Sequence, residues 1–323
     1  MRPLKFHPIL KQTLWGGERI IPYKELASGL SRVGESWELS GMPGSESVVA
    51  EGPWAGSTLS ELIGRFGAEL LGKANYARFG QEFPLLVKFI DAREDLSIQV
   101  HPDDELARKR HGKSGKCEMW YVLEAEPGAS LLTGFSRPIA PAEYERRVAD
   151  NTLTDVLNRQ AIASGDVFYL PAGRVHSIGK GSFIVEIQQS SDITYRIYDF
   201  DRRDAAGNSR ELHTELAREA IDFESSENSR ITYAPENNQE VRLVTTPYFT
   251  TSLYTLTART RCDWSATDSF VAIVLLQGSG SLTDNEGNRI DVRQGETWFL
   301  PASTQWTEIT PHTAPLRLLT SRI

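Results

Sequence analysis

Residues 165–176 read GDVFYLPAGRVH, and this stretch decides the fold. Gly165 and Gly173 stand where glycine permits tight turns at either end of a short apolar run. The apolar run itself is typical of a buried β-strand. Pro171 stiffens the turn that follows the run. We therefore expect the turn to direct His176 into the interior of a β-structure.

Two earlier pieces of the chain supply side chains that suit the same interior. Gln99 and His101 are two residues apart in an extended segment, and Lys116 and Glu118 are two apart before an apolar run. Residues two apart on a strand face the same side, so each pair can face one interior. Together with His176 they offer two imidazoles, one carboxylate and one amide. A zinc ion takes such ligands and leaves a position open for water or substrate.

Short β-rich runs bounded by turn residues dominate the rest of the chain, which predicts antiparallel β-modules. Examples are residues 84–90, 119–123, 166–170, 183–188 and 270–276. Helical patterns interrupt these runs. A capping box at Thr58 and Glu61 predicts a helix to about Gly72, and residues 103–115 predict a short helix capped at Asp103 and ended near Gly112. Residues 141–160 predict one or two helices, and residues 211–223 an amphipathic connector.

An internal repeat indicates a second β-module. Residues 295–302, GETWFLPA, repeat residues 165–172, GDVFYLPA. In the second copy Trp306 stands where His176 stands in the first, and neutral indole cannot ligate zinc. We expect Trp306 to fill the interior of this module instead. A polar segment at residues 224–229 predicts a linker, and hence two domains, 1–224 and 225–323, the second of them without metal.

The stretch 165–176 matches the second signature of the cupin barrel at every fixed position. Further segments closely resemble type I mannose-6-phosphate isomerases, and the pattern is similar to the short form of that family. These segments are residues 83–91, 96–104, 115–120, 174–177 and 187–199. The resemblance implies a mainly β fold of two cupin-type, jelly-roll barrels with helical insertions. It also implies an aldose–ketose isomerase with one zinc per chain, which interconverts mannose 6-phosphate and fructose 6-phosphate through an enediolate.

Candidate site residues follow from the motifs and the resemblance together. Metal ligands are His101, Glu118 and His176, with Gln99 as a weaker ligand because an amide oxygen is a poor donor. The resemblance places a catalytic arginine at Arg196, where alternation puts Thr194, Arg196 and Tyr198 on one face. A guanidinium stays protonated and suits an enediolate or a phosphate.

The general base and the phosphate ligands are less determined by the sequence. Glu186 resembles an active-site carboxylate of the family and is one candidate base. A hydroxide held by the metal is the alternative, and the sequence does not choose between them. Lys116 is a candidate catalytic and substrate-binding residue, and Lys88 a candidate phosphate ligand. Trp15 resembles a pocket tryptophan of the family. Arg202 and Arg203 stand where longer members of the family carry a lysine.

Composition excludes several other classes of protein. The 323 residues carry a net charge of -8 without a basic run, so nucleic acid and anionic membranes are poor partners. Residues 1–8 lack the apolar run of a signal peptide, and no apolar stretch is long enough to span a membrane. Two cysteines far apart in sequence fit a reducing compartment. We expect a cytoplasmic protein with a sugar phosphate substrate, as a monomer or a homodimer.

Two other functions remain open at the level of sequence. A cupin dioxygenase would use two histidines and a carboxylate around iron. A non-catalytic sugar-binding cupin would use the same barrel and would need a partner domain. Neither has a sequence signal beyond the shared barrel motif.

Overall fold

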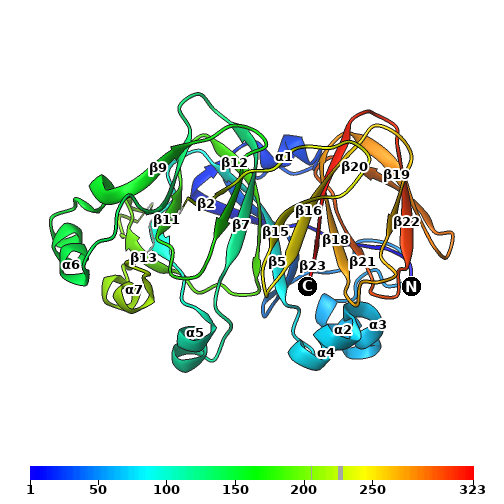
Figure 1. Cartoon of the computed structure of the whole chain (residues 1–323), viewed down its shortest axis with the longest axis horizontal. Coiled ribbons are helices and arrows are strands. Elements are labelled where there is room, and N and C mark those ends of the chain that lie inside the picture. The colour runs from blue at the N-terminus through cyan, green and yellow to red at the C-terminus, as the bar shows by residue number, and fades with distance from the viewer. Residues whose placement is uncertain (205, 225–227) are drawn as a thin grey trace.

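Two β-rich lobes lie side by side in the computed structural model, which describes residues 1–204, 206–224 and 228–323 (Figure 1). Each lobe contains two antiparallel sheets. The predicted mainly β, cupin-like fold is confirmed. No helix within the described residues is both long and apolar enough to cross a membrane.

The first lobe is built from an eight-stranded and a five-stranded sheet. In order of pairing, the larger sheet contains β14 (Arg230–Ile231), β10 (Val167–Leu170), β7 (Glu118–Ala125), β12 (Ser182–Gln189), β5 (Leu85–Ala92), β2 (Ile9–Gly17), β3 (Val33–Met42) and β4 (Ser45–Glu46). The smaller contains β13 (Tyr195–Tyr198), β6 (Ile98–Val100), β11 (His176–Ile178), β8 (Ser130–Phe135) and β9 (Leu157–Ala161). Strands β5 and β12 are buried along their whole length, because protein covers both faces of the larger sheet.

The second lobe repeats this plan with a six-stranded and a four-stranded sheet. The first contains β1 (Leu4–Lys5), β21 (Thr297–Leu300), β18 (Val271–Gln277), β23 (Leu316–Arg322), β16 (Thr250–Leu256) and β15 (Val241–Thr245). The second contains β17 (Thr260–Asp263), β22 (Trp306–Pro311), β19 (Ser279–Asp284) and β20 (Arg289–Arg293). The repeated stretch forms β10 in the first lobe and β21 in the second, as the internal repeat predicts.

Trp306 does not fill the interior of the second lobe, and that expectation was wrong. Its side chain is half-buried, and the Arg261 guanidinium lies 4.3 Å from the ring centroid. Trp264 and Trp298 occupy the apolar core of this lobe instead. The next residue, Thr307, is the one that points inward, since it accepts a hydrogen bond from Trp264 Nε1. The face on which a residue lies therefore differs between the two copies of the repeat.

Helices are short and lie outside the sheets. They are α1 (Ile20–Tyr23), α2 (Leu59–Phe66), α3 (Ala68–Leu71), α4 (Lys73–Phe79), α5 (Asp104–His111), α6 (Pro141–Ala149) and α7 (Thr214–Ala220), with a 3₁₀ turn at Leu153–Val156. The capping box at Thr58 is present, but α2 ends at Gly67 rather than near Gly72. Helix α5 has the predicted N-cap at Asp103 and the left-handed Gly112 at its end. Residues 157–160, expected to be helical, lie in β9 because this strand pairs with β8.

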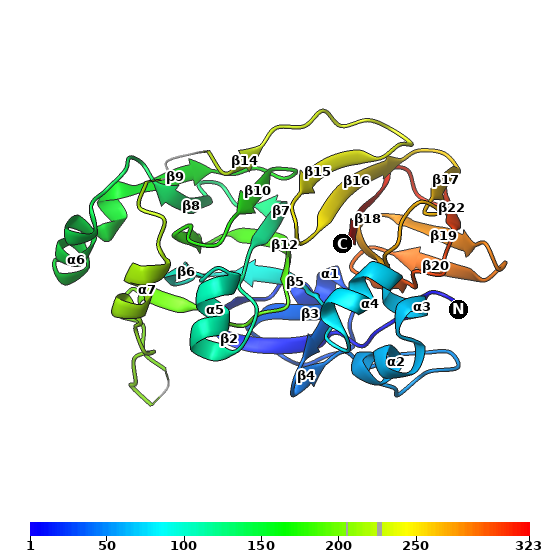
Figure 2. The same cartoon turned by 60° about the horizontal axis from the view of Figure 1, so that its bottom comes forward.

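The two lobes are joined by more than one crossing of the chain. Helices α2, α3 and α4 precede β5 but lie together against the second lobe (Figures 1 and 2). Strand β1 pairs with β21 of the second lobe, and β14 pairs with β10 of the first. One apolar core contains residues of both lobes, including Phe83, Phe270 and Phe299. Residues 225–227 lie outside the described residues, and a domain boundary between 224 and 225 stays a prediction.

Candidate active site and metal centre

Three buried side chains meet between the two sheets of the first lobe. Glu118 begins β7 of the larger sheet, while His176 begins β11 and His101 follows β6 of the smaller sheet. Their ligand atoms all lie within 4.8 Å of one another. Glu118 Oε1 is 3.2 Å from His176 Nε2, and Glu118 Oε2 is 3.5 Å from His101 Nε2. Among the described residues, this is the one His, Cys, Asp and Glu group with metal-binding geometry.

Backbone carbonyls orient both imidazoles. His101 Nδ1 lies 2.8 Å from the Ile193 carbonyl oxygen, and His176 Nδ1 lies 2.8 Å from the Arg174 carbonyl oxygen. A carbonyl can only accept, so each Nδ1 carries the hydrogen and donates it. Each Nε2 then presents its lone pair to Glu118 and to the space between the rings. Metal-bound histidines are held in this way by hydrogen bonds on the other nitrogen.

The donor set and its unsatisfied atoms fit a zinc-type cation. His101 Nε2 and both carboxylate oxygens of Glu118 are buried without a hydrogen bond, although Lys116 Nζ lies 3.1 Å from Glu118 Oε2. Burial of these atoms is costly unless a further cation satisfies them. Burial, with Lys116 adding to it, lowers the pKa of His101 to about 3, and burial also lowers the pKa of His176. Burial alone would raise the pKa of Glu118, but Lys116 and the two imidazoles bring it well below its usual value. All three groups are therefore in the deprotonated form that a metal requires.

Gln99 reaches the same centre from β6. It pairs in register with His176 of β11, and its Nε2 lies 3.3 Å from His176 Nε2. Its Oε1 accepts a hydrogen bond of 3.3 Å from Ser97. Rotating the side-chain amide of Gln99 by half a turn exchanges its oxygen and nitrogen and hardly changes its shape. The oxygen then points to the group formed by His101, Glu118 and His176.

A buried ion pair forms the neighbouring wall of the site. Lys88 and Glu186 are cross-strand partners on β5 and β12, and Lys88 Nζ lies 3.0 Å from Glu186 Oε1. Trp120 Nε1 donates to Glu186 Oε2 at 2.9 Å. Burial acts to lower the pKa of Lys88, but the charge of Glu186 outweighs it and raises this pKa. Glu186 is thus a fixed carboxylate with a protonated lysine beside it.

The remaining candidate residues line one cavity of about 180 Å³. Its lining includes Trp15, Lys88, Gln99, Lys116, Glu186 and Arg196. Lys116 Nζ lies 3.1 Å from Glu118 Oε2, so these two residues share a face as alternation predicts. The three candidate metal ligands contact this lining through Gln99 and Lys116. The structure therefore brings the six lining candidates and the three candidate metal ligands to one place.

Arg196 enters the cavity from β13, where it pairs in register with Gln99. Its Nη1 donates to the Glu211 carbonyl at 2.9 Å, while its buried Nε has no hydrogen-bond partner. Thr194 lines the same cavity, but Tyr198 does not. The register of β13 against β6 shifts between Arg196 and Tyr198, so strict alternation fails there.

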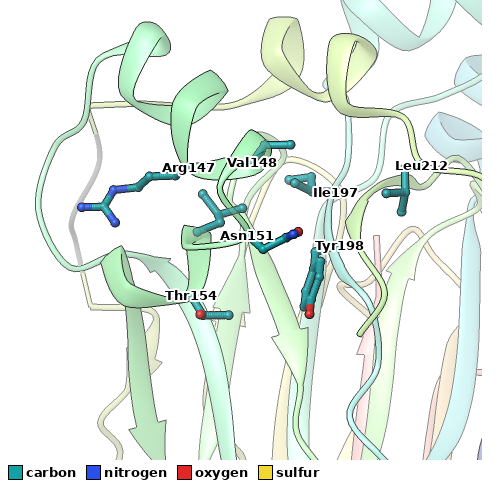
Figure 3. Close-up of a pocket in the computed structure, with 8 residues that line it drawn as sticks. Arg147, Val148, Asn151, Thr154, Ile197, Tyr198 and Leu212 are labelled. Carbon is teal, nitrogen blue, oxygen red and sulfur yellow. The ribbon is translucent and has the colours of Figure 1, made fainter. Parts of the chain in front are cut away.

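Tyr198 lines a second, small cavity (Figure 3). Ile197 and Leu212 line it with Tyr198, as do Arg147 of α6 and Asn151 just after that helix. Apolar groups dominate these contacts. The expected common face of Thr194, Arg196 and Tyr198 was therefore wrong for Tyr198.

Sequence reasoning missed four charged or aromatic side chains that line the main cavity, namely Glu35, Trp37, Asp192 and Arg210. Glu35 and Trp37 alternate on β3, and Trp37 Nε1 donates to Glu35 Oε2 at 2.6 Å. A charged residue alternating with an aromatic one in a strand is a weak signal that was available. Arg210 lies in a loop, where no periodicity marks it.

Known proteins are similar to this chain over most of its length. The model of the type I phosphomannose isomerase catalytic domain matches residues 4–132. A probable mannose-6-phosphate isomerase of Bacillus subtilis, GmuF, is 34% identical over 303 residues, which is 93% of each chain. A mannose-6-phosphate isomerase of Streptococcus mutans is 33% identical over 302 residues, covering 93% of this chain and 92% of that one.

A solved structure agrees over the whole chain. The crystal structure of a mannose 6-phosphate isomerase from Bacillus subtilis superposes with a TM-score of 0.90 at 30% identity and covers 100% of both chains. A cupin-like β-protein with a buried two-histidine, one-carboxylate centre is thus the class that fold and site define. The chain belongs to the type I mannose-6-phosphate isomerase family.

Proposed function

We propose that this protein is a zinc-dependent aldose–ketose isomerase that interconverts mannose 6-phosphate and fructose 6-phosphate through an enediolate. The observation that carries the proposal is the meeting of a buried His101, Glu118 and His176 group with a cavity lined by lysines and arginine. Family membership supports the substrate. Both cysteines are free and buried, which supports the predicted reducing, cytoplasmic location.

The residues that would hold zinc are His101, Glu118 and His176, with Gln99 beside them. A zinc ion bound there supplies Lewis-acid stabilisation to substrate oxygens that gain negative charge. The protein groups prepare for this by keeping both imidazoles neutral and Glu118 ionised at neutral pH.

Glu186 is the base that we assign to the proton transfer. Its carboxylate would take the proton from C2 of open-chain mannose 6-phosphate, leaving an enediolate, and would return that proton to C1. The hydroxyl proton moves from O2 to O1, so the sugar is isomerised without net change in charge. Lys88 and Trp120 each hold one oxygen of this carboxylate, which fixes its direction. Arg196 offers a permanent positive charge to the enediolate oxygens.

The experiment that tests the function is a coupled assay of fructose 6-phosphate formation from mannose 6-phosphate. The protein as purified should turn over, lose activity after chelation, and recover it with added zinc. Oxygen consumption measured in parallel should be absent. A protein that is inactive with zinc, or that consumes oxygen with iron, would contradict the proposal.

The proton path has its own test. Turnover in heavy water should place deuterium on C1 or C2 of the product when the base exchanges its proton with solvent. Full retention of the substrate hydrogen over many turnovers would instead favour a hydride shift or a completely shielded base.

A further inference from the structure

Arg210 is held in the active-site cavity by a buried carboxylate. Its Nε donates to Asp199 Oδ2 at 2.8 Å, and its Nη2 donates to Asp199 Oδ1 at 2.5 Å. The side chain of Asp199 is 6% exposed, whereas that of Arg210 is 30% exposed and lines the cavity. A guanidinium forked onto a carboxylate in this way has a fixed plane. The remaining N–H groups of Arg210 are therefore directed by Asp199 rather than by solvent.

Three arginines, Arg196, Arg202 and Arg210, lie around the buried carboxylate of Asp199, and the neighbouring Glu94 and Glu211 carboxylates are exposed. Asp199 also lies 3.4 Å from Arg202 Nη1, so one carboxylate serves two arginines. Arg202 has a second, longer contact of 3.7 Å with the half-exposed Glu94. Arg196 has no carboxylate within ion-pair distance among the described residues, and its Nη1 is bound only to a neutral carbonyl. This end of the cavity therefore favours an anion.

The lysines of the cavity differ from these arginines. Lys88 pairs with Glu186 at 3.0 Å, and Lys116 pairs with Glu118 at 3.1 Å. Each thus has a buried carboxylate as its ion-pair partner beside the reacting groups, and Glu118 is shared with the proposed metal site. A sugar phosphate brings close to two negative charges, and the unmatched cations available to it lie at the arginine end.

Arg196 is influenced by the neighbouring arginines and carboxylates together. Burial lowers the pKa of Arg196, and the nearby charge of Arg210 lowers it further, while Asp199 and Glu211 act to raise this pKa. Two guanidiniums that repel each other are stabilised together when an anion lies between them.

We infer that Arg210 binds the phosphate group of the substrate, with Asp199 as the residue that positions it. Arg196 pairs in register with Gln99, which contacts His176, so Arg196 belongs to the reacting end of the sugar. Arg210 comes from the loop that follows β13 and takes the phosphorylated end. The inference rests on the proposed function, since it assigns the phosphate subsite of that same cavity.

The test compares Arg210→Gln and Arg210→Lys with the zinc-loaded wild-type enzyme. Loss of a charged, forked contact to phosphate should raise KM for mannose 6-phosphate by about 10- to 100-fold and leave kcat within about threefold. Arg210→Lys keeps the positive charge without the two-pronged contact, so its KM should fall between those of the wild type and Arg210→Gln. Arg203→Gln is the matched control, because Arg203 is exposed in the same loop and does not line the cavity.

A measurement without turnover separates this inference from the proposed function. Inorganic phosphate should raise the melting temperature of the wild type and of Arg203→Gln, and do so much less in Arg210→Gln. If the wild type is active and Arg210→Gln leaves both KM and phosphate binding unchanged, the inference about Arg210 is overturned and the proposed function is not. A variant that loses kcat with KM unchanged also overturns the inference, because Arg210 would then act on the reacting atoms. A wild type without isomerase activity overturns the proposed function itself.

Discussion

Each imidazole of the metal centre uses one nitrogen for the backbone and leaves the other for a cation. We predict that alanine at His101, Glu118 or His176 removes most of the bound zinc and nearly all turnover, because each loses a buried donor. Gln99→Ala should lose less metal, since an amide is the weakest donor of the four. Elemental analysis of dialysed variants checks this. A fully loaded His176→Ala protein would show that the metal lies elsewhere.

Arg196 offers a second test at the scale of one residue. If it stabilises charge that develops in the reaction, Arg196→Ala should lower kcat by about 10²- to 10³-fold, as for the loss of one preorganised donor. If it only holds the substrate, KM should rise while kcat changes little. Steady-state kinetics with mannose 6-phosphate decides between these roles. Unchanged kinetics would remove Arg196 from the site.

The candidate site was predictable from sequence where strands impose their two-residue period. Lys116 and Glu118, or Gln99 and His101, share a face because they alternate on extended chain. Arg210 was not predictable in this way, because its place depends on a loop and on its contact with Asp199. Side chains brought in by loops follow no period, so only the folded chain shows them.

At the scale of elements, the sequence predicts where helices are capped, but it does not predict which strands pair with each other. Thr58 and Asp103 begin helices as predicted, since their side chains accept from backbone N–H groups a few residues ahead. Residues 157–161 form a strand because β8 offers a partner, which a single stretch of sequence does not reveal. Strand formation depends on tertiary context more than helix capping does.

Helix α4 begins against the second lobe, and its capping can be tested by pH. The exposed Asp268 carboxylate accepts hydrogen bonds from Lys73 N at 2.7 Å and Ala74 N at 2.9 Å. Gly72 must be glycine there, since a Cβ would lie 2.2 Å from the Asp268 carbonyl oxygen. We predict that Asp268→Ala lowers the melting temperature at neutral pH by about 1–3 °C.

The pH dependence of this stabilisation follows from the direction in which the pKa of Asp268 is shifted. Hydrogen bonds from Ala74 and Lys73 hold the pKa of Asp268 below its ordinary value of 3.8. The stabilisation is therefore present above the unfolded pKa and is lost as the pH falls through the lower folded pKa. The melting temperatures of wild type and Asp268→Ala should converge as the pH falls below 3.8, whereas the exposed control Asp291→Ala should show no such convergence. A constant difference across this range would contradict the prediction.

At the scale of the molecule, the lobes share one apolar core. Phe270 stacks on Phe299 with ring centroids 5.2 Å apart, and Phe83 of the first half of the chain lies 5.0 Å from Phe270. We predict that a protein ending at residue 224 is insoluble or aggregated, because this apolar surface would face water. Soluble yield and size-exclusion chromatography measure the outcome. A monomeric, cooperatively folding fragment that binds zinc would show that the first 224 residues are independent.

The architecture as a whole was predictable because the sequence repeats itself. The stretch GETWFLPA at residues 295–302 contains β21, just as the stretch GDVFYLPA at residues 165–172 contains β10. The role of Trp306 was not predictable, since a shift of one residue moves a side chain to the other face of a strand. Repeats therefore indicate backbone geometry more securely than they indicate which side chain fills a core.

The pairing of β1 with β21 sets an order on folding during synthesis. Leu4 pairs with Phe299, so β1 leaves the ribosome long before the strand with which it pairs. At roughly 5–20 residues per second, translation separates the two by tens of seconds. Throughout that interval β1 lacks its partner strand β21, and the six-stranded sheet is complete only after β23 has emerged.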